Sequence, residues 1–326
     1  MSFSNKYRVL IVGCGNIGGR FDFTTNTFGS PQTHAGAYLN HPGFHLSACL
    51  DLDSKKLIEF AEKFKIKNKY TNLDQIEKQE DFFDVISICS PTNQHFKNIQ
   101  QSLRFKPKLI FCEKPISYSL NEAKKIKSIC ENANIPVAVN LSRRFDPRLI
   151  DLKEKILNKS FGELRTVIGI YNKGILNNGI HFIDLMNYLF DEIKIIHVGN
   201  PIKDYLESDP TIPLLMENNQ KVPIYLATSF ASDYSIFEIQ FLFSKCSIII
   251  EDGGQTWRIR DVEESNKFKG YKYLNRGYFT KGGDSNSMSN AIDNIYRFLS
   301  YGENLKSTID DAISAQIFCE EVKIRL

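Results

Sequence analysis

The chain has 326 residues, 42% of them hydrophobic and 24% charged, and a formal net charge of +3 at pH 7. This length suits two domains, and the composition excludes a chain that is disordered throughout. The small, scattered charge gives no reason to expect nucleic acid or an acidic membrane as partner, and no run approaches the roughly 18–20 apolar residues that span a bilayer. The seven cysteines form no CxxC pair, which predicts buried free thiols in a reducing cytoplasm and no metal site.

The first part of the chain alternates short apolar runs with amphipathic stretches, the pattern of βαβ units. The strands predicted there are Arg8–Val12, His45–Leu50, Asp84–Cys89, Leu109–Cys112 and Pro136–Asn140. The predicted helices are Ser54–Phe64 and Ser119–Ala133, and the second opens with a capping box of Ser119 and Glu122. The pattern predicts an α/β fold that begins with a Rossmann domain, a doubly wound parallel sheet over residues 1–120.

A glycine motif, Gly13-Cys14-Gly15-Asn16-Ile17-Gly18, follows the first strand. In such a motif the first glycine permits a tight turn, the second lets the backbone approach a pyrophosphate, and the third lets helix and strand pack closely. The N-terminus of the helix that follows offers N–H groups to the phosphates. We therefore predict that a dinucleotide binds at Gly13, Gly15, Asn16, Ile17 and Gly18. A plain glycine-rich turn is the alternative.

Asp51 ends the second strand, where a carboxylate can accept both ribose hydroxyls of the adenosine and would repel a 2′-phosphate, which favours NAD over NADP. A helix cap or a solvated loop acid is the alternative. Asp51 lies 33 residues beyond Gly18, where about 20 is usual. We assign the excess to Phe21–Gln32, a loop that interrupts the first helix before it resumes at Thr33. This loop is either a lid or flap near the substrate or a plain surface insertion.

Two further motifs follow the third and fourth strands, at the edge where open α/β sheets bind ligands. They are Ser90-Pro91-Thr92-Asn93-Gln94-His95 and Glu113-Lys114-Pro115. Pro91 fixes a turn, and Thr92 can offer a hydroxyl to a cofactor; a structural Ser/Thr–Pro turn is the alternative. An ammonium at Lys114 can stabilise an oxygen that becomes an alkoxide as hydride leaves its carbon. Taken alone, Lys114 also fits a solvated surface lysine.

From about Leu164 the runs lengthen and become rich in β-branched and aromatic residues, which predicts a largely antiparallel sheet in a second domain, residues 121–326. The predicted strands are Leu164–Tyr171, Ile195–Val198, Ile224–Ser229, Ile236–Phe243 and Cys246–Glu251. One helix, Ile180–Phe190, interrupts them, and a last helix, Thr308–Ile324, closes the chain. We interpret Asn200–Val222 as a surface excursion. An exposed sheet face predicts a homo-oligomer, a dimer or a tetramer.

The helix at Ile180 carries His181 and Asp184 near its start. Imidazole titrates near neutrality and is the natural proton acceptor from a sugar hydroxyl, although a hydrogen-bonded core histidine is the alternative. Asp184 either contacts substrate or orients and caps locally. The candidate hydrogen-bonding groups for a polyhydroxylated substrate are Asn140, Arg144, Tyr171, Asn177 and Asp184. Arg144 and its neighbour Arg143 could instead pair with acids at the domain junction.

Four segments together resemble the Gfo/Idh/MocA family, named for glucose–fructose oxidoreductase, inositol dehydrogenase and a rhizopine-catabolism protein. They are Ser90–His95, Glu113–Pro115, Asn140–Pro147 and Asn178–Asp184. The resemblance covers nearly the whole chain and implies an NAD(P)-dependent enzyme of carbohydrate metabolism that acts on a CH–OH group of a sugar-like small molecule. It implies that Lys114 acts at the substrate hydroxyl and His181 as general acid/base. The residues it implies at the cofactor are Ser90, Pro91, Thr92, His95, Glu113 and Lys114.

One position departs from the family pattern. Many relatives carry an aspartate four residues before the histidine, where this chain has Asn177. An amide can orient an imidazole but supplies no negative charge. Either His181 acts alone with Lys114, which we favour, or another acid helps, from the insert for example, or catalysis is lost. We expect hydride transfer on a sugar, with nucleotide sugars of surface polysaccharides as candidates; a non-catalytic dinucleotide-binding regulator and a dehydrogenase of a dihydrodiol or small ketone are the alternatives.

Overall fold

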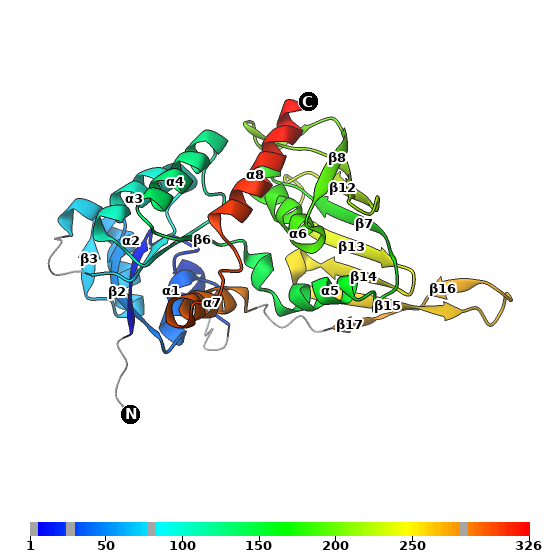
Figure 1. The fold of residues 1–326 in the computed structure, drawn as a ribbon, viewed down its shortest axis with the longest axis horizontal. Coiled ribbons are helices and arrows are strands. Elements are labelled where there is room, and N and C mark those ends of the chain that lie inside the picture. The colour runs from blue at the N-terminus through cyan, green and yellow to red at the C-terminus, as the bar shows by residue number, and fades with distance from the viewer. Residues whose placement is uncertain (1–5, 24–29, 77–81, 281–285) are drawn as a thin grey trace. The chain divides into compact units, whose positions relative to one another are not determined.

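A computed structural model describes residues 6–23, 30–76, 82–280 and 286–326. The chain divides into two compact units, and Figure 1 labels many of their elements. The first contains residues 1–146 and 286–314, and the second contains residues 147–285 and 315–326. This division differs from the expected boundary at residue 120. The strand Val137–Val139 still pairs with Leu109–Cys112 in the first sheet, and residues 286–314 return to the first unit.

The first unit is built on a six-stranded parallel sheet in the order β3-β2-β1-β4-β5-β6. Its strands are β1 (Tyr7–Val12), β2 (Phe44–Leu50), β3 (Asn68–Tyr70), β4 (Val85–Ile88), β5 (Leu109–Cys112) and β6 (Val137–Val139). The strands β4 and β5 are buried along their whole length and are apolar except for Ser87, as expected of parallel strands covered on both faces. The predicted Rossmann sheet is confirmed.

Helices cover both faces of this sheet. They are α1 (His34–Asn40), α2 (Ser54–Phe64), α3 (His95–Ser102), α4 (Leu120–Asn132) and α7 (Ser287–Tyr301), with the start of α8 (Ile309–Ile324). One buried cluster joins Val9 and Ile11 of β1 to α1, α2 and α7. Another joins Leu10 and Val12 to α3, α4 and α8. Successive side chains of β1 therefore point to opposite faces, and each face is packed.

One helix of this unit, α7, was not predicted, and one local prediction was wrong. The sequence predicts no helix in the region that forms α7, yet α7 buries Met288, Ala291, Ile292 and Ile295. The capping box at Ser119 does not form, because the Ser119 side chain makes no cap hydrogen bond. Instead the hydroxyl of Ser117 accepts the N–H of Ser119 (3.0 Å) and donates to the carboxylate of Glu122.

The second unit is built on a nine-stranded sheet in the order β16-β15-β14-β13-β7-β12-β11-β8, with β17 paired to β15, and on a small β9–β10 sheet. The strands are β7 (Leu164–Tyr171), β8 (Ile193–Val198), β9 (Ile202–Leu206), β10 (Asp209–Thr211), β11 (Leu214–Asn218), β12 (Pro223–Thr228), β13 (Phe237–Phe243), β14 (Cys246–Glu251), β15 (Thr256–Glu264), β16 (Lys272–Leu274) and β17 (Tyr278–Thr280). Among the strand pairs described for this unit, only β7 and β12 pair in parallel, so the largely antiparallel sheet is confirmed.

Helices α5 (Pro147–Leu157) and α6 (Ile180–Phe190) contribute to the hydrophobic core of this unit, together with one face of the sheet. A Cβ atom on Gly169 of β7 would lie 2.3 Å from the ring of Phe182 on α6. Because the helix approaches the strand this closely, a larger residue at 169 would force the two apart. The packing fixes α6, and with it His181 in the first turn of that helix.

The segment Asn200–Val222 is not the surface excursion that its prolines and polar residues suggest. It forms β9, β10 and β11, and β11 pairs with both β8 and β12. Its buried residues include Asp209, Thr211, Ile212, Leu214 and Met216. The strands are short and separated by turn residues, so their alternation is hard to recognise in the sequence.

All seven cysteines are buried and free, as predicted. Within the described ranges, no helix has both the length and the apolarity that crossing a membrane requires.

Candidate functional site

The glycine motif forms a tight turn after β1. Gly13 has a φ of 104°, and a Cβ atom there would lie 2.6 Å from the backbone nitrogen of Ser90. A Cβ on Gly18 would lie 2.2 Å from the carbonyl oxygen of Gly13, so close packing requires both glycines. A Cβ on Gly15 would meet nothing within 4 Å. Gly15 therefore borders open space in which a phosphate group can approach the backbone.

The helix after this turn is interrupted, as the spacing of Asp51 predicts. The helical turns that begin at Gly15 end near Phe23, and α1 begins at His34. The N–H of His34 then bonds to the carbonyl of Ile17 (3.1 Å), and the N–H of Ala35 bonds to the carbonyl of Gly18 (2.9 Å). The first N–H groups of α1 thus bond to carbonyl groups of residues that precede the loop. Residues 24–29 of the predicted insert lie outside the described residues. The prediction that the insert acts as a lid or flap concerns these residues.

A cavity of 1030 Å³, which we call the glycine-turn cavity, lies beside this turn. Its volume is at the upper end of the roughly 300–1000 Å³ typical of small-molecule and cofactor sites. Its walls include the following predicted cofactor residues: Gly13, Gly15, Asn16, Ile17, Asp51, Ser90 and Pro91. The other predicted cofactor residues do not line it: Gly18, Thr92, His95, Glu113 and Lys114. Its size and the open space at Gly15 fit a dinucleotide.

Asp51 is held in the wall of this cavity by the backbone. One carboxylate oxygen accepts the N–H of Cys14 in the glycine turn (2.8 Å), and the other accepts the N–H of Asp53 (2.9 Å). Each oxygen keeps a lone pair for a further donor. The cap of α2 is Asp53, which accepts the N–H groups of Lys55 and Lys56. Asp51 is therefore an oriented acceptor and not the helix cap of the alternative interpretation.

Glu113 lies at the centre of a buried network at the end of β5. One of its oxygens accepts from His34 Nε2 (2.8 Å) and from Asn140 Nδ2 (2.6 Å). Its other oxygen accepts the backbone N–H of Lys114 (3.3 Å). Burial alone would raise the pKa of Glu113, but the hydrogen bond and charge of His34, with Asn140 and Lys114, hold that pKa below its usual value. Glu113 is therefore an anion in spite of its burial.

His34 is the member of this network that the sequence did not single out. Its side chain is fully buried, and its Nδ1 lies 2.8 Å from the hydroxyl of Ser87 on β4. In the sequence it is only part of the stretch in which the interrupted helix resumes. A polar residue on the buried face of a short helix was the available signal, but its partners lie far along the chain.

His95 joins the two strand-end motifs from the inside. Its ring is only 1% exposed, and its Nε2 and Nδ1 lie 2.9 Å and 3.1 Å from the carbonyl oxygens of Ser90 and Pro115. Burial lowers its pKa, although the carbonyl of Ser90 acts in the opposite direction. The structure thus places His95 behind the two loops rather than at the cavity wall where a cofactor contact was expected.

Asn140 and Arg144, predicted at the substrate, have partners inside the first unit. Asn140 donates to Glu113, and its Oδ1 is buried with no hydrogen-bond partner among the described residues. The guanidinium of Arg144 pairs with the carboxylate of Asp311 at 3.0 Å. This contact matches the alternative interpretation of Arg144, in which it pairs with an acid. Asn140 is linked to Lys114 indirectly, because both donate a hydrogen bond to the carboxylate of Glu113.

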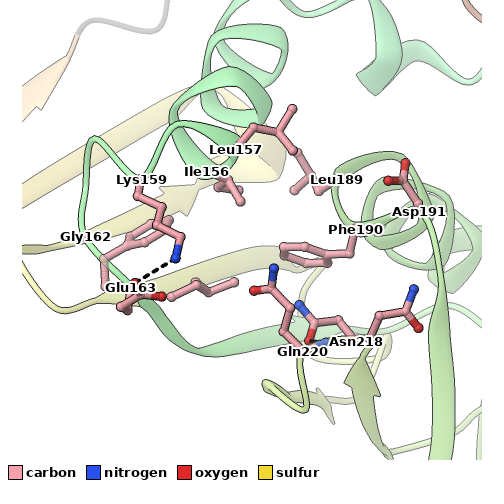
Figure 2. A pocket seen from close by; sticks show the side chains of 13 residues that line it. Ile156, Leu157, Lys159, Gly162, Glu163, Leu189, Phe190, Asp191, Asn218 and Gln220 are labelled. Atoms are coloured by element: carbon pink, nitrogen blue, oxygen red, sulfur yellow. Dashed lines mark hydrogen bonds and ion pairs between the residues drawn. The ribbon is translucent and has the colours of Figure 1, made fainter.

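The second unit contains a smaller cavity of 250 Å³, shown in Figure 2. It lies among the ends of α5 and α6 and the turn between β11 and β12, near the contact of Lys159 with Glu163 (3.0 Å). Its lining includes Phe190, Asn218 and Gln220 and none of the predicted site residues. We therefore do not assign it to the candidate site.

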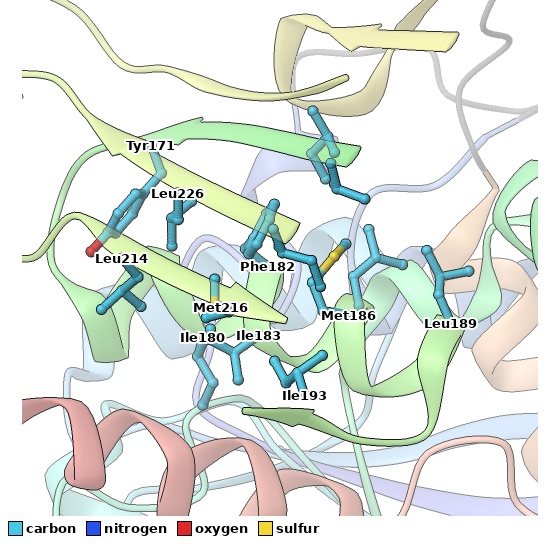
Figure 3. Close-up of a cluster of buried hydrophobic side chains, with 14 of the residues drawn as sticks. Tyr171, Ile180, Phe182, Ile183, Met186, Leu189, Ile193, Leu214, Met216 and Leu226 are labelled. Atoms are coloured by element: carbon cyan, nitrogen blue, oxygen red, sulfur yellow. The ribbon is translucent and has the colours of Figure 1, made fainter. Parts of the chain in front are cut away.

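Tyr171 belongs to the core of the second unit, as Figure 3 shows. Its side chain is fully buried. Its hydroxyl donates to the carbonyl of Ile212 (3.0 Å) and accepts the N–H of the same residue (2.7 Å). This position differs from the substrate-facing one that the sequence suggests, because both hydrogen-bonding functions of the hydroxyl are used in holding β7 to the chain beside β10.

A single π-helical turn, Ile175–Gly179, leads into α6. The carboxylate of Asp209 on β10 accepts the N–H groups of Leu176 (2.9 Å) and Asn177 (2.8 Å). A Cβ on Gly174 would lie 2.2 Å from that carboxylate. The side chain of Asn177 donates from Nδ2 to the carbonyl of Lys173 (3.0 Å). Asp209, which the sequence did not single out, thus supplies the acid of this turn, and π-turns of this kind are frequent at functional sites.

His181 lies in the first turn of α6, partly buried, with its ring edge-on to Phe237 at a centroid distance of 6.4 Å. Asp184 follows on the same helix and is only 2% exposed. A carboxylate this deeply buried fits a local orienting role better than direct contact with substrate. The two predicted catalytic residues belong to different units, with Lys114 in the first and His181 in the second.

Residues 7–141 match the model of the Gfo/Idh/MocA oxidoreductase family, described as having an NAD-binding Rossmann fold. An uncharacterized oxidoreductase, YrbE of Bacillus subtilis, is 28% identical over 152 residues, which are 47% of this chain and 40% of that protein. Myo-inositol 2-dehydrogenase of Thermotoga maritima is 28% identical over 118 residues, 36% of this chain and 35% of that protein. The matched region thus spans about two fifths of these curated relatives.

The fold of the whole chain is similar to that of the 3-ketoreductase KijD10 from Actinomadura kijaniata, solved in complex with NADP and TDP-benzene. The TM-score is 0.75 at 14% sequence identity, and the match covers 98% of each chain. At this identity the likeness establishes the fold alone.

Proposed function

We propose that this chain, a member of the Gfo/Idh/MocA oxidoreductase family through its Rossmann domain, transfers a hydride between a nicotinamide dinucleotide and the carbinol carbon of a sugar. The observation that carries the proposal is the glycine-turn cavity, which combines the open space at Gly15 with the oriented carboxylate of Asp51. Gly15, Asn16 and Ile17 would hold the phosphates, and Asp51 the adenosine ribose. When bound, the nicotinamide ring accepts or supplies the hydride at its C4 atom.

In this proposal the protein's own groups act on the substrate oxygen and its proton. The ammonium of Lys114 stabilises the negative charge that develops on the oxygen. The imidazole of His181 takes the hydroxyl proton in oxidation and returns it in reduction. The carboxylate of Glu113, one residue before Lys114, accepts the backbone N–H of the lysine and so helps to hold the segment that carries the ammonium. A sugar is supported by the myo-inositol relative, and a nucleotide sugar by the TDP derivative bound to KijD10.

The test is a panel of free sugars, inositols and nucleotide sugars, assayed for formation or loss of NADH absorbance with the purified full-length chain. We expect turnover with at least one polyhydroxylated compound and none with dihydrodiols or small ketones. Turnover of a dihydrodiol alone would replace the sugar proposal with the non-sugar dehydrogenase. Tight NADH binding without turnover of any compound would favour the non-catalytic regulator, an alternative that the amide at Asn177 keeps open.

We expect a preference for NAD over NADP that depends on Asp51. Its carboxylate is fixed at the end of β2, where it would repel a 2′-phosphate. The variant Asp51→Asn should lower the ratio of kcat/KM for NAD to that for NADP by about tenfold, which corresponds to about 1.4 kcal/mol. Asp53→Asn is the matched control, because it removes the same charge from the same cavity wall. Equal shifts in both variants would mean that Asp51 has no specific contact with the ribose.

We also propose a homo-oligomer that forms through the uncovered sheet face of the second unit. On this face Tyr225 is 46% exposed and lies beside Ile168 of β7, while alternate residues of both strands enter the core. Apolar patches of this kind commonly mark subunit contacts. Light scattering should therefore give a mass of at least twice 37.4 kDa, and Tyr225→Asp should reduce it. A mass of 37.4 kDa for the unaltered protein would contradict the proposal.

A further inference from the structure

The position of His34 in the first unit is fixed by contacts at the start of helix α1. The carboxylate of Asp22, itself buried, accepts the N–H of Gln32 (3.0 Å) and of Thr33 (3.1 Å), which clasps the two ends of the insert together. Thr33 caps α1 by accepting the N–H of Gly36 (3.1 Å), so the helix begins at the residue that follows, His34. The ring of His34 packs against Phe111 of β5 with a centroid distance of 4.6 Å.

The hydrogen bonds of His34 define its role in the network. Since Glu113 is an anion and can only accept, Nε2 of His34 must carry a proton and donate to it. Nδ1 lies 2.8 Å from the hydroxyl of Ser87, from which it accepts in the neutral ring and to which it donates in the charged ring. The imidazole therefore bridges a fixed group of the sheet to the carboxylate that precedes Lys114. Without that donor, Glu113 would lose one of the groups that offset the cost of burying its charge.

A second observation concerns the amide of Asn140, which is part of this network. The Oδ1 atom of Asn140 is buried with no partner in the part of the chain that the structure describes, although its Nδ2 atom donates to Glu113. A buried acceptor without a partner is unfavourable and is uncommon in a native structure, so it calls for an explanation. The orphaned oxygen lies in the same side-chain group that orients Glu113.

We propose that His34 is a positioning residue that acts through Glu113 to fix the Glu113–Lys114 segment for hydride transfer. This inference rests on the proposed function of Lys114. In this proposal His34 touches neither substrate nor cofactor. Its ring donates a hydrogen bond to the carboxylate of Glu113, and that carboxylate accepts the backbone N–H of Lys114. The ammonium of Lys114 then contacts the substrate oxygen. A helix that resumes after an insertion thereby supports a catalytic group on another strand.

The test compares His34→Ala, His34→Gln and the control His41→Ala. His41 caps the other end of α1 and lies 3.5 Å from the carboxylate of Asp293, so the control removes a carboxylate-facing histidine from the same helix. We expect His34→Ala to lower kcat by about 100-fold, the effect of misplacing a reacting group by about 1 Å. The NADH dissociation constant and the substrate KM should stay within about threefold. His34→Gln, which keeps an N–H donor, should recover most of the loss, and His41→Ala should stay within about twofold.

A second measurement needs no turnover. The rate at which an amine-directed acylating reagent modifies Lys114, followed by mass spectrometry of the folded full-length chain, should change at least about threefold in His34→Ala and remain the same in His41→Ala. An unchanged rate, or an equal loss of kcat in His34→Gln and His34→Ala, would overturn the inference. If the unaltered protein turns over no compound while the labelling rate still responds to His34, the proposed function fails and the positioning role stands.

Discussion

Replacing Lys114 with methionine should lower kcat by about 1000-fold, at the upper end of the effect of removing one group that stabilises a developing oxyanion. Methionine keeps most of the side-chain volume but removes the charge. The glycine-turn cavity does not include Lys114, so the NADH dissociation constant should stay within about threefold. Initial rates at saturating cofactor measure the first quantity, and quenching of protein fluorescence by NADH measures the second.

The matched control for this variant is Lys108→Met. Lys108 immediately precedes β5, whereas Lys114 lies two residues after the end of that strand. The half-exposed side chain of Lys108 pairs through its ammonium with the carboxylate of Asp84 at 2.9 Å. We expect its kcat within about twofold of the unaltered protein, as for other surface substitutions. A Lys114→Met protein that keeps a tenth of its kcat, or that loses NADH binding in the same proportion, would contradict the assignment of Lys114 to the substrate oxygen.

Replacing His181 with asparagine should lower kcat by about 1000-fold, within the 10²–10⁴-fold contribution of general acid/base catalysis. Asparagine retains a hydrogen-bonding group but cannot exchange a proton near neutral pH. His197→Asn, on the exposed part of β8, is the control and should leave kcat within about twofold. Unchanged turnover in His181→Asn would assign the proton transfer to another group.

The double variant Lys114→Met/His181→Asn shows whether the two residues act as a unit. Groups that act on the same oxygen have effects that are far from additive. We therefore expect the double variant to be about as slow as the slower single variant. Multiplied losses would mean that the two side chains act in separate steps, and the proposal that both act on the same substrate oxygen would fail.

The amide at Asn177 suits this structure better than the aspartate that the family resemblance implies at this position. Asn177 donates a side-chain hydrogen bond to the carbonyl of Lys173, which an ionised carboxylate cannot do. The backbone N–H of Asn177 is already bound by the carboxylate of Asp209, so an aspartate at 177 would bring a second negative charge to the same turn. The acid of this turn therefore comes from β10, a segment that the sequence presents as a surface excursion.

The local features of this chain can be predicted from its sequence. The helices Ser54–Phe64 and Ile180–Phe190 and the strands Leu164–Tyr171 and Cys246–Glu251 have the predicted bounds, because their periodicity reflects burial on one or both faces. The spacing from Gly18 to Asp51 likewise reveals the interruption of the first helix. These features depend on residues that are neighbours along the chain, and their patterns are therefore visible in it.

The contacts that organise the site were decided by the tertiary structure. His34 and Glu113 are 79 residues apart, Arg144 and Asp311 are farther apart still, and Asp209 reaches Asn177 from a different strand. No local pattern marks such pairs, because hydrogen-bond partners are chosen by the distance between atoms in the folded chain and by the cost of leaving a buried polar group unpaired. The sequence determined which chemical groups stand at the strand and helix ends; the fold determined which of them hold the others in place.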